Sequence, residues 1–471
     1  MTWVRWRGWE HLALVLIAIG GPLAQVFSSP IYSSGDEAAH VDYALQVWRG
    51  QLPIFENGLI LGNEVGFLPS VQWTAQHPPL FYILLAPVVG PLADAGFVNA
   101  AGMAARIVVV ALSVALIYAV RASARLLMPA TPAVGTASSV IVGLSVWFTR
   151  LGGSVYNDIL AATLVAVTLA LLIAMLRGDR RWRTVIWFAL ASAACASTRL
   201  SIVPVAVLFA VTAGIGFWVV KGERRSRLLG AAALGPAAIL VFSGWFYIRN
   251  VMLTGSISGG HPDWAVERTG RTFHTPWEVA TDLDFWIRMM PQFSTQSTGW
   301  STRTFLLTVA VLFILPAAAG VVMFIRRALA PHGPQRAVDL LVLAAIACAV
   351  GGIAAMQILH VAGAGSALPR YFFALVPLLA PFMALALLTP RSWPALLAVW
   401  SASRVAMGAA ELDATLGRQF GSPQAEIQPV AAWIGFALSA AGAALLVTIL
   451  AVRRRVGTTE VGSDESERSP R

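Results

Sequence analysis

Charged residues are scarce in this sequence, and cysteine and lysine are scarcer still. Asp, Glu, Lys and Arg make up 12% of its 471 residues, whereas an ordinary soluble protein carries about 25%. The two cysteines, Cys195 and Cys348, stand inside apolar runs, so the sequence offers neither a disulfide framework nor a cysteine-rich metal motif. Lys221 is the single lysine. These absences exclude a soluble domain of ordinary composition and a disulfide-stapled secreted fold.

Motifs of nucleotide chemistry are also missing. The sequence contains no Walker motif, no dinucleotide fingerprint and no Gly-x-Ser-x-Gly element. The net charge of +10 does not indicate nucleic acid, because most arginines stand in short segments between apolar runs. We therefore expect neither a cytosolic nucleotide-dependent reaction nor a nucleic-acid partner.

Hydrophobic residues are abundant and make up 57% of the chain. Apolar runs recur from end to end at the length needed to cross a hydrocarbon core of about 30 Å. The sequence therefore predicts an all-α, polytopic transmembrane helical bundle with about 12 spans. The expected spans are 10–28, 101–121, 131–149, 156–176, 183–199, 201–220, 228–248, 304–325, 337–358, 371–388, 393–410 and 430–452.

The basic residues give the expected orientation in the cell (plasma or inner) membrane. Six arginine-rich clusters fall on one side only if about 12 spans are counted and both termini are cytoplasmic. A poor cleavage site follows the first apolar run, so we expect an uncleaved first span. The clusters are Arg121/Arg125, Arg177/Arg180/Arg181/Arg183, Lys221/Arg224/Arg225/Arg227, Arg326/Arg327/Arg336, Arg391 and Arg453/Arg454/Arg455.

The apolar segment 78–91 is too short for an ordinary span, so we expect a re-entrant or interfacial helix there. The expected organisation follows from this choice. It consists of a cytoplasmic N-terminus and first span (1–28), an extracytoplasmic catalytic loop with juxtamembrane helices (29–100), a transmembrane bundle (101–248), a second extracytoplasmic loop (249–303), a C-terminal bundle (304–452) and a disordered cytoplasmic tail (453–471).

Ionisable residues gather at the external ends of the expected spans, whereas the span interiors are nearly free of charge. Charges held near a bilayer are costly and are candidates for function. Carboxylates beside several arginines suit an acceptor hydroxyl or amine together with an anionic lipid phosphate. The residues at this depth are Asp36, Glu37, His40, Asp42, His77, Arg106, Arg150, Asn157, Asp158, Arg199, Arg249, Arg303, His360 and Arg370.

Plainer interpretations stay open for several of these residues. Asp36 and Glu37 open an expected helix over 36–49, where acids commonly cap the N-terminus. His40 lies one turn after Asp36 and is as well explained by a structural role. Gln76-His77-Pro78-Pro79-Leu80 suits a helix-entry bend. Asn157-Asp158 suits an N-cap, and Arg249 and Arg370 suit interfacial anchors.

Taken in order, the motifs resemble the GT-C superfamily of integral membrane glycosyltransferases, and most of all the branch with protein O-mannosyltransferases, aminoarabinose transferases and related uncharacterised bacterial enzymes. The resemblance runs from Ser29 to about Leu388. It rests on Gly35-Asp36-Glu37-Ala38-Ala39-His40, Tyr43, Arg49-Gly50-Gln51-Leu52-Pro53, His77-Pro78-Pro79-Leu80-Phe81-Tyr82, Ala105-Arg106, Asn157-Asp158, Trp245-Phe246-Tyr247-Ile248-Arg249-Asn250 with Gly255, and Arg370-Tyr371-Phe372 with Pro377.

The resemblance implies an inverting glycosyltransferase that moves a sugar from a polyprenyl-phosphate donor to a cell-envelope glycan, lipid or protein acceptor on the extracytoplasmic face. It implies that Asp36 is the catalytic carboxylate, with Glu37 beside it. Arg106, Arg249 and Arg370 are then expected to hold the donor phosphate or shape its pocket. The remaining expected donor- or substrate-binding residues are His40, His77, Asn157, Asp158, Asn250 and Tyr371.

The sequence departs from this pattern in two ways. It has no large C-terminal soluble domain, and no lysine follows His77-Pro78-Pro79, which weighs against a protein acceptor. Two alternatives remain: a transporter or flippase of a lipid-linked sugar, and a non-catalytic envelope-assembly protein. No metal site has a convincing ligand spacing, and the sequence leaves open whether a divalent metal assists.

Overall fold

The computed structural model describes residues 2–62, 68–294, 301–330, 335–389, 394–417 and 427–467, and side-chain placement within 7–454. It is 78% helical and, over these residues, contains no strand. The all-α class predicted from the sequence is confirmed. The helices are α1 Thr2–Ser28, α2 Gly35–Trp48, η1 Phe55–Asn57, α3 Leu80–Asp94, α4 Val98–Leu127, α5 Ala133–Gly143, α6 Val146–Gly152, α7 Asp158–Leu176, α8 Trp182–Ala196, η2 Leu200–Ile202, α9 Val203–Val219, α10 Ser226–Thr254, α11 Pro262–Thr269, α12 Pro276–Thr281, α13 Leu283–Met289, α14 Thr302–Val309, η4 Ala310–Ile314, α15 Leu315–Leu329, α16 Arg336–Ala362, η5 Pro369–Phe372, α17 Leu375–Leu387, α18 Ala395–Leu416 and α19 Pro429–Glu467.

Nine helices of the described chain are long and apolar enough to cross a membrane, or ten if α5 and α6 form one span bent by 67°. The expected count of twelve is not confirmed. The difference lies in α8 and α17, which contain 15 and 13 residues. At 1.5 Å of rise per residue such helices extend about 20 Å, which is less than a hydrocarbon core of about 30 Å.

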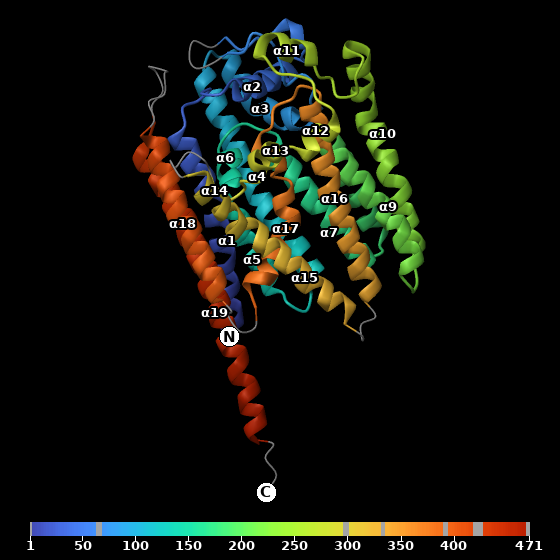
Figure 1. Cartoon of the computed structure of the whole chain (residues 1–471), viewed down its shortest axis with the longest axis vertical. Helices are drawn as coiled ribbons and strands as arrows, with labels where there is room; N and C mark the ends of the chain where they lie inside the picture. Colours follow the sequence, from blue (N-terminus) through green and yellow to red (C-terminus); the bar gives the residue numbers. More distant parts are fainter. Residues whose placement is uncertain are drawn as a thin grey trace.

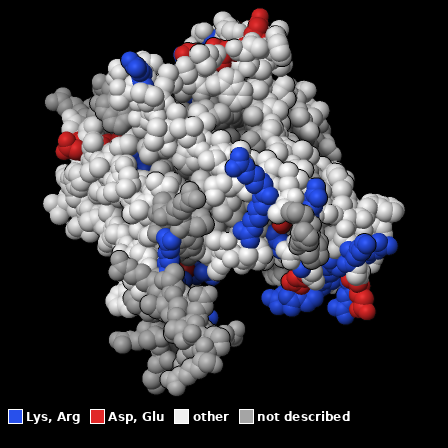
Figure 2. Space-filling view, turned by 60° about the horizontal axis from the view of Figure 1, so that its bottom comes forward, with Lys and Arg blue, Asp and Glu red and all other residues white. Residues whose placement is uncertain are grey.

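The arginine-rich clusters lie at one end of the bundle, which we call the basic end. Bonds between them fix this arrangement: Arg121, Arg125 and Arg453 all reach Glu10. Further bonds join Arg177 to Asp339, Arg180 to the Lys221 carbonyl and Arg327 to Thr131. The termini lie toward the same end (Figure 1), and Figure 2 shows exposed Lys and Arg gathered there. Five of the six expected clusters therefore share one end; Arg391 lies outside the described residues.

The opposite end, which we call the loop end, carries α2, α3, α11, α12 and α13 (Figure 1). The segment expected to be interfacial or re-entrant forms α3, a short apolar helix that packs beside α2. Trp48 and Arg49 at the end of α2 both donate to Asp94 at the end of α3. These bonds join the C-terminal ends of the two helices, which run side by side in the same direction, as the His40–Tyr82 bond nearer their starts also shows.

Helix α19 docks against α1 at very close range. A Cβ on Gly20 would lie 2.3 Å from the Ser439 nitrogen, and one on Gly435 would lie 2.6 Å from the Ala24 nitrogen. A Cβ on Gly442 would likewise lie 2.6 Å from the Ile17 nitrogen. Only glycine permits backbones this close. The pair α1–α19 consequently forms a continuous wall along one edge of the bundle.

Candidate active site

Asp36 stands in the first turn of α2 but does not cap it. The N-cap is Ser34, whose hydroxyl accepts from the Glu37 nitrogen at 3.3 Å. This leaves the Asp36 carboxylate, 31% exposed, to receive a 2.5 Å hydrogen bond from Arg370 Nη2. The capping interpretation of Asp36 is therefore wrong, because the serine two residues earlier takes that role.

Arg370 is held between two aromatic rings. Its guanidinium carbon lies 4.6 Å from the centre of the Tyr156 ring and 5.1 Å from that of Tyr371. The Tyr156 hydroxyl bonds to Ser34, which connects this cradle to the start of α2. Arg370 Nε is buried and has no hydrogen-bond partner in the described chain. One guanidinium donor at the site is therefore still unsatisfied.

A second ion pair adjoins the first. Arg199 donates to Asp158 at the start of α7 and to Asn157 Oδ1 at 3.4 Å, and its guanidinium lies 5.0 Å from the Tyr371 ring centre. The Tyr371 ring is thus within cation–π distance of the guanidiniums of both Arg199 and Arg370. Asp158 and Asn157 are buried, whereas the edge of the group at Asp36 is reachable from solvent.

Two histidines, His40 buried and His77 partly buried, line the same group. The rings of His40 and His77 are parallel with centres 6.0 Å apart, and His40 Nδ1 is hydrogen-bonded to the Tyr82 hydroxyl at 2.9 Å. Burial lowers the pKa of His40 far below 6.5, and the charges of Arg370 and Arg199 lower it further. Burial and the Arg199 charge do the same to the pKa of His77. Both imidazoles are neutral near pH 7.

Glu37 and Arg106 form a separate, fully buried pair. Glu37 accepts from Arg106 through both oxygens at 2.7 Å and from the backbone nitrogens of Tyr32 and Val155. The remaining Arg106 donors go to the carbonyls of Val26, Ser29 and Pro30. A guanidinium has five N–H groups, and all of them are used. The pair therefore ties the end of α1, the loop to α2 and the loop to α7 together.

Arg249 and Asn250 lie in another group. Arg249 donates to the Pro53 carbonyl at 2.7 Å, and Asn250 donates to the Gln76 carbonyl at 3.3 Å. Both line a pocket of about 340 Å³ with Phe55 and other residues of the first and second loops. The structure thus joins Asp36, His40, His77, Asn157, Asp158, Arg370 and Tyr371 in one site and places Glu37–Arg106 and Arg249–Asn250 beside it.

Three contributors were not predicted from the sequence as catalytic or binding residues. Tyr156 was not singled out, Tyr82 was named only as part of the motif that begins at His77, and Arg199 only among the external ionisable residues. A sequence signal existed for Tyr156, which directly precedes Asn157-Asp158. Within the part of the chain that the structure describes, no group of three His, Cys, Asp or Glu side chains is arranged to hold a metal.

The chemistry available at this site is one reachable carboxylate, two guanidiniums and two neutral imidazoles at the loop end. Such a set suits an acceptor that loses a proton and a leaving group that carries negative charge. Helices far apart in sequence supply it: α2, the loop before α3, the start of α7, the segment after α8 and η5.

Comparisons with known proteins identify the fold. No protein-family model matches the sequence, and no curated protein matches it. Among solved structures, ArnT from Cupriavidus metallidurans bound to undecaprenyl phosphate has a TM-score of 0.50 at 14% identity, covering 100% of this chain and 81% of ArnT. The apo structure gives a TM-score of 0.51 at 15% identity, covering 94% and 77%. The chain therefore has a GT-C-type fold.

Proposed function

From this GT-C-type fold, we propose that the chain is a glycosyltransferase that transfers a sugar, with inversion, from a polyprenyl-phosphate donor to an acceptor in the cell envelope. The observation that carries the proposal is the reachable Asp36 carboxylate held against Arg370 at the loop end. The undecaprenyl phosphate bound by the structurally similar ArnT supports a donor of this class.

Asp36 would act as the base. The acceptor oxygen attacks the anomeric carbon, the bond from that carbon to the phosphate oxygen breaks, and the electron pair leaves with the polyprenyl phosphate. The acceptor proton passes to the Asp36 carboxylate. One carboxylate suffices as the general base for this reaction, because a phosphate monoester dianion is a good leaving group once its charge is stabilised.

Arg370 and Arg199 would stabilise that charge. In the structure Arg370 neutralises Asp36, and its Nε has no partner among the described residues. A phosphate is a stronger competitor than a solvated carboxylate for a planar guanidinium. Donor binding would draw Arg370 toward the phosphate and release Asp36 to take the proton. The neutral His40 and His77 would form the polar wall beside the sugar.

Glu37 and Arg106 would serve this site as positioning residues. Both side chains are about 1–2% exposed, and every donor of Arg106 is already used. Together they set the path of the loop that presents Asp36. Arg249 and Asn250 would shape the neighbouring pocket between the first and second loops, where part of the donor or acceptor would lie.

This function requires the loop end to face outside the cytoplasm, with both termini and the basic end inside, as positive residues favour. The 29–100 and 249–303 segments then form the catalytic face above two transmembrane halves, 101–248 and 304–452. A lipid or glycan fits the absence of a lysine after His77-Pro78-Pro79 better than a protein acceptor does.

Reconstitution into liposomes separates transfer from transport. The purified chain is incubated with a radiolabelled polyprenyl-phosphate sugar and an envelope lipid extract. We expect the label to move onto an acceptor with release of polyprenyl phosphate. Movement of the intact donor across the bilayer without its cleavage would identify a flippase instead. If neither transfer nor movement is observed, a non-catalytic assembly role is indicated.

A further inference from the structure

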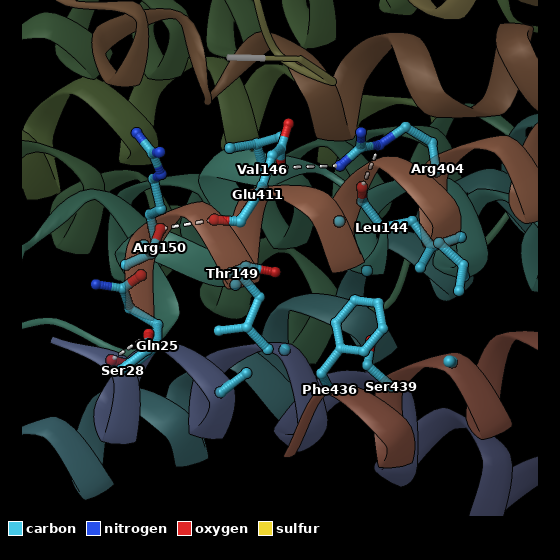
Figure 3. Close-up of a pocket in the computed structure, with 18 residues that line it drawn as sticks. Gln25, Ser28, Leu144, Val146, Thr149, Arg150, Arg404, Glu411, Phe436 and Ser439 are labelled. Atoms are coloured by element: carbon cyan, nitrogen blue, oxygen red, sulfur yellow. Dashed lines mark hydrogen bonds and ion pairs between the residues drawn. The ribbon is translucent and has the colours of Figure 1, made fainter. Parts of the chain in front are cut away.

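A second cavity, away from Asp36, lies between α1, the bend from α5 to α6, α18 and α19 (Figure 3). Its unfilled space, part of which is open to the surroundings, amounts to about 650 Å³. Gly21, Gly143 and Gly408 line it, and Phe436 and Leu412 add an apolar surface. Gln25, Thr149 and Ser439 add polar groups.

An ion pair within α18 lines this cavity. Arg404 and Glu411 are seven residues apart on one helix face, with Nη2 and Oε2 separated by 3.6 Å. Their side chains are only 3% and 11% exposed. Arg404 Nε donates to the Leu144 carbonyl at the bend between α5 and α6. The expectation of nearly charge-free span interiors is therefore wrong at this position.

The pair is incompletely satisfied. Arg404 Nη1, Glu411 Oε1 and the nearby Ser401 hydroxyl of α18 are buried without a hydrogen-bond partner in the described chain. An unsatisfied charged donor and acceptor are costly inside a bilayer. Because the two charges cancel, the group that would satisfy these atoms is neutral and both donates and accepts hydrogen bonds. Two adjacent hydroxyls can do so.

The bundle edge indicates where such a group would come from. Helices α18 and α19 lie along one edge of the bundle (Figure 1). Their outward faces carry large exposed apolar side chains, including Val399, Val430 and Ile434 at 64%, 74% and 56% exposure. In a membrane these faces contact lipid, so the cavity behind them is reached most directly from the bilayer.

We propose that this cavity binds the hydroxyl-rich, uncharged headgroup of a neutral glycolipid, with Arg404 donating to one sugar hydroxyl and Glu411 accepting from another. Phe436 packs against the apolar face of the ring, and the acyl chains leave between α18 and α19. The site is distinct from the Asp36–Arg370 site and does not depend on the proposed transfer activity.

Native mass spectrometry of the full chain in detergent tests the site with monoglucosyl-diacylglycerol. We expect this lipid to bind about tenfold or more tightly than diacylglycerol, because diacylglycerol lacks the adjacent hydroxyls that would form hydrogen bonds to both charged groups. Methyl glucoside distinguishes a lipid from a free sugar and should compete only weakly. Equal affinity for diacylglycerol would overturn the proposal, and equal affinity for methyl glucoside would overturn its lipid source.

Two variants place the bound lipid in the cavity. The double substitution Arg404→Leu/Glu411→Leu removes both polar partners without leaving a lone charge. Gly408→Leu instead adds bulk to the cavity wall against Phe436, since a Cβ at this position would lie 3.0 Å from the Phe436 ring. Both should weaken glucosyl-lipid binding about tenfold or more, whereas Arg49→Leu/Asp94→Leu, at an exposed pair of α2 and α3, should not. Unchanged binding in either cavity variant contradicts the assignment, and thermal melting checks that each is folded.

Discussion

Arg370 Nη2 donates a hydrogen bond of 2.5 Å to Asp36 Oδ2, and the two residues are 334 positions apart in the chain. The contact joins η5, near the C-terminal third, to the first turn of α2. It places the one reachable carboxylate of the site against a cation that is itself held between Tyr156 and Tyr371. The proposed chemistry depends on this relationship.

Replacing Arg370 is expected to weaken binding of a polyprenyl phosphate. Arg370→Ala removes the planar donor that would contact the phosphate, so its Kd should rise about tenfold or more. Arg370→Lys keeps the positive charge but loses the planar pair of donors. Its Kd should lie between those of the wild type and Arg370→Ala. Binding is measured by titration of the purified chain. Arg49→Ala, at the exposed Arg49–Asp94 pair, is the matched control, and an unchanged Kd in Arg370→Ala removes the phosphate role.

The Glu37–Arg106 pair is expected to govern stability rather than phosphate binding. Arg106→Gln leaves the buried Glu37 carboxylate without its cation, which costs about 3–5 kcal/mol. The melting temperature of Arg106→Gln in detergent should be sharply lower than that of the wild type. Glu37→Gln should lower the melting temperature as well. An Arg106→Gln variant that melts like the wild type but no longer binds polyprenyl phosphate would show that Arg106 is a ligand instead.

Acid is expected to destabilise the fold through His40 and His77. Their folded-state pKa values lie well below 6.5 because burial and nearby arginines oppose protonation. The unfolded chain takes up these protons near pH 6.5 and the folded chain does not. Stability is thus unaffected by these groups above that pH and falls as the pH drops below it. The melting temperature of His40→Gln/His77→Gln should fall less between about pH 7 and about pH 5 than that of the wild type; an equal or steeper fall refutes the assignment.

Gln292 is expected to position Arg370. Its side chain donates to the Pro369 carbonyl at 2.8 Å, and its backbone carbonyl accepts from the Ser145 hydroxyl at 2.9 Å, which links η5 to the bend between α5 and α6. Gln292→Met keeps the volume but loses the donor. We expect the KM for the donor to rise by about threefold to tenfold with a smaller change in kcat. A loss confined to kcat would mean that Gln292 acts on the chemical step rather than on donor placement.

The transmembrane character could be predicted from the sequence because it rests on length and charge, which are local properties. Basic clusters such as Arg121/Arg125 and Arg453/Arg454/Arg455 were predicted to lie at the same end of the bundle. The ion pairs of Arg121 and Arg453 with Glu10 agree with this prediction. The count of spans was less predictable. An apolar run that packs inside a bundle, such as α8 or α17, has the same composition as one that crosses a membrane.

The site was predictable as a set of candidates but not as a set of pairs. Sequence order placed Asp36, Arg106, Arg249 and Arg370 at one depth. Which arginine pairs with which carboxylate depends on helix packing. In the structure Glu37 pairs with Arg106, and Asp36 pairs with Arg370. Arg404 was overlooked, although its spacing of seven residues from Glu411 puts both on one face of a helix.

The most direct test of the account is sugar transfer by Asp36→Asn. Asparagine keeps the size of the side chain and an oxygen that can accept from Arg370, but it cannot take a proton from the acceptor. We predict that turnover with a polyprenyl-phosphate sugar falls by about 10²–10⁴-fold, while binding of the donor changes little. Turnover equal to that of the wild type, with the same donor and acceptor, would contradict the central claim that Asp36 is the catalytic base.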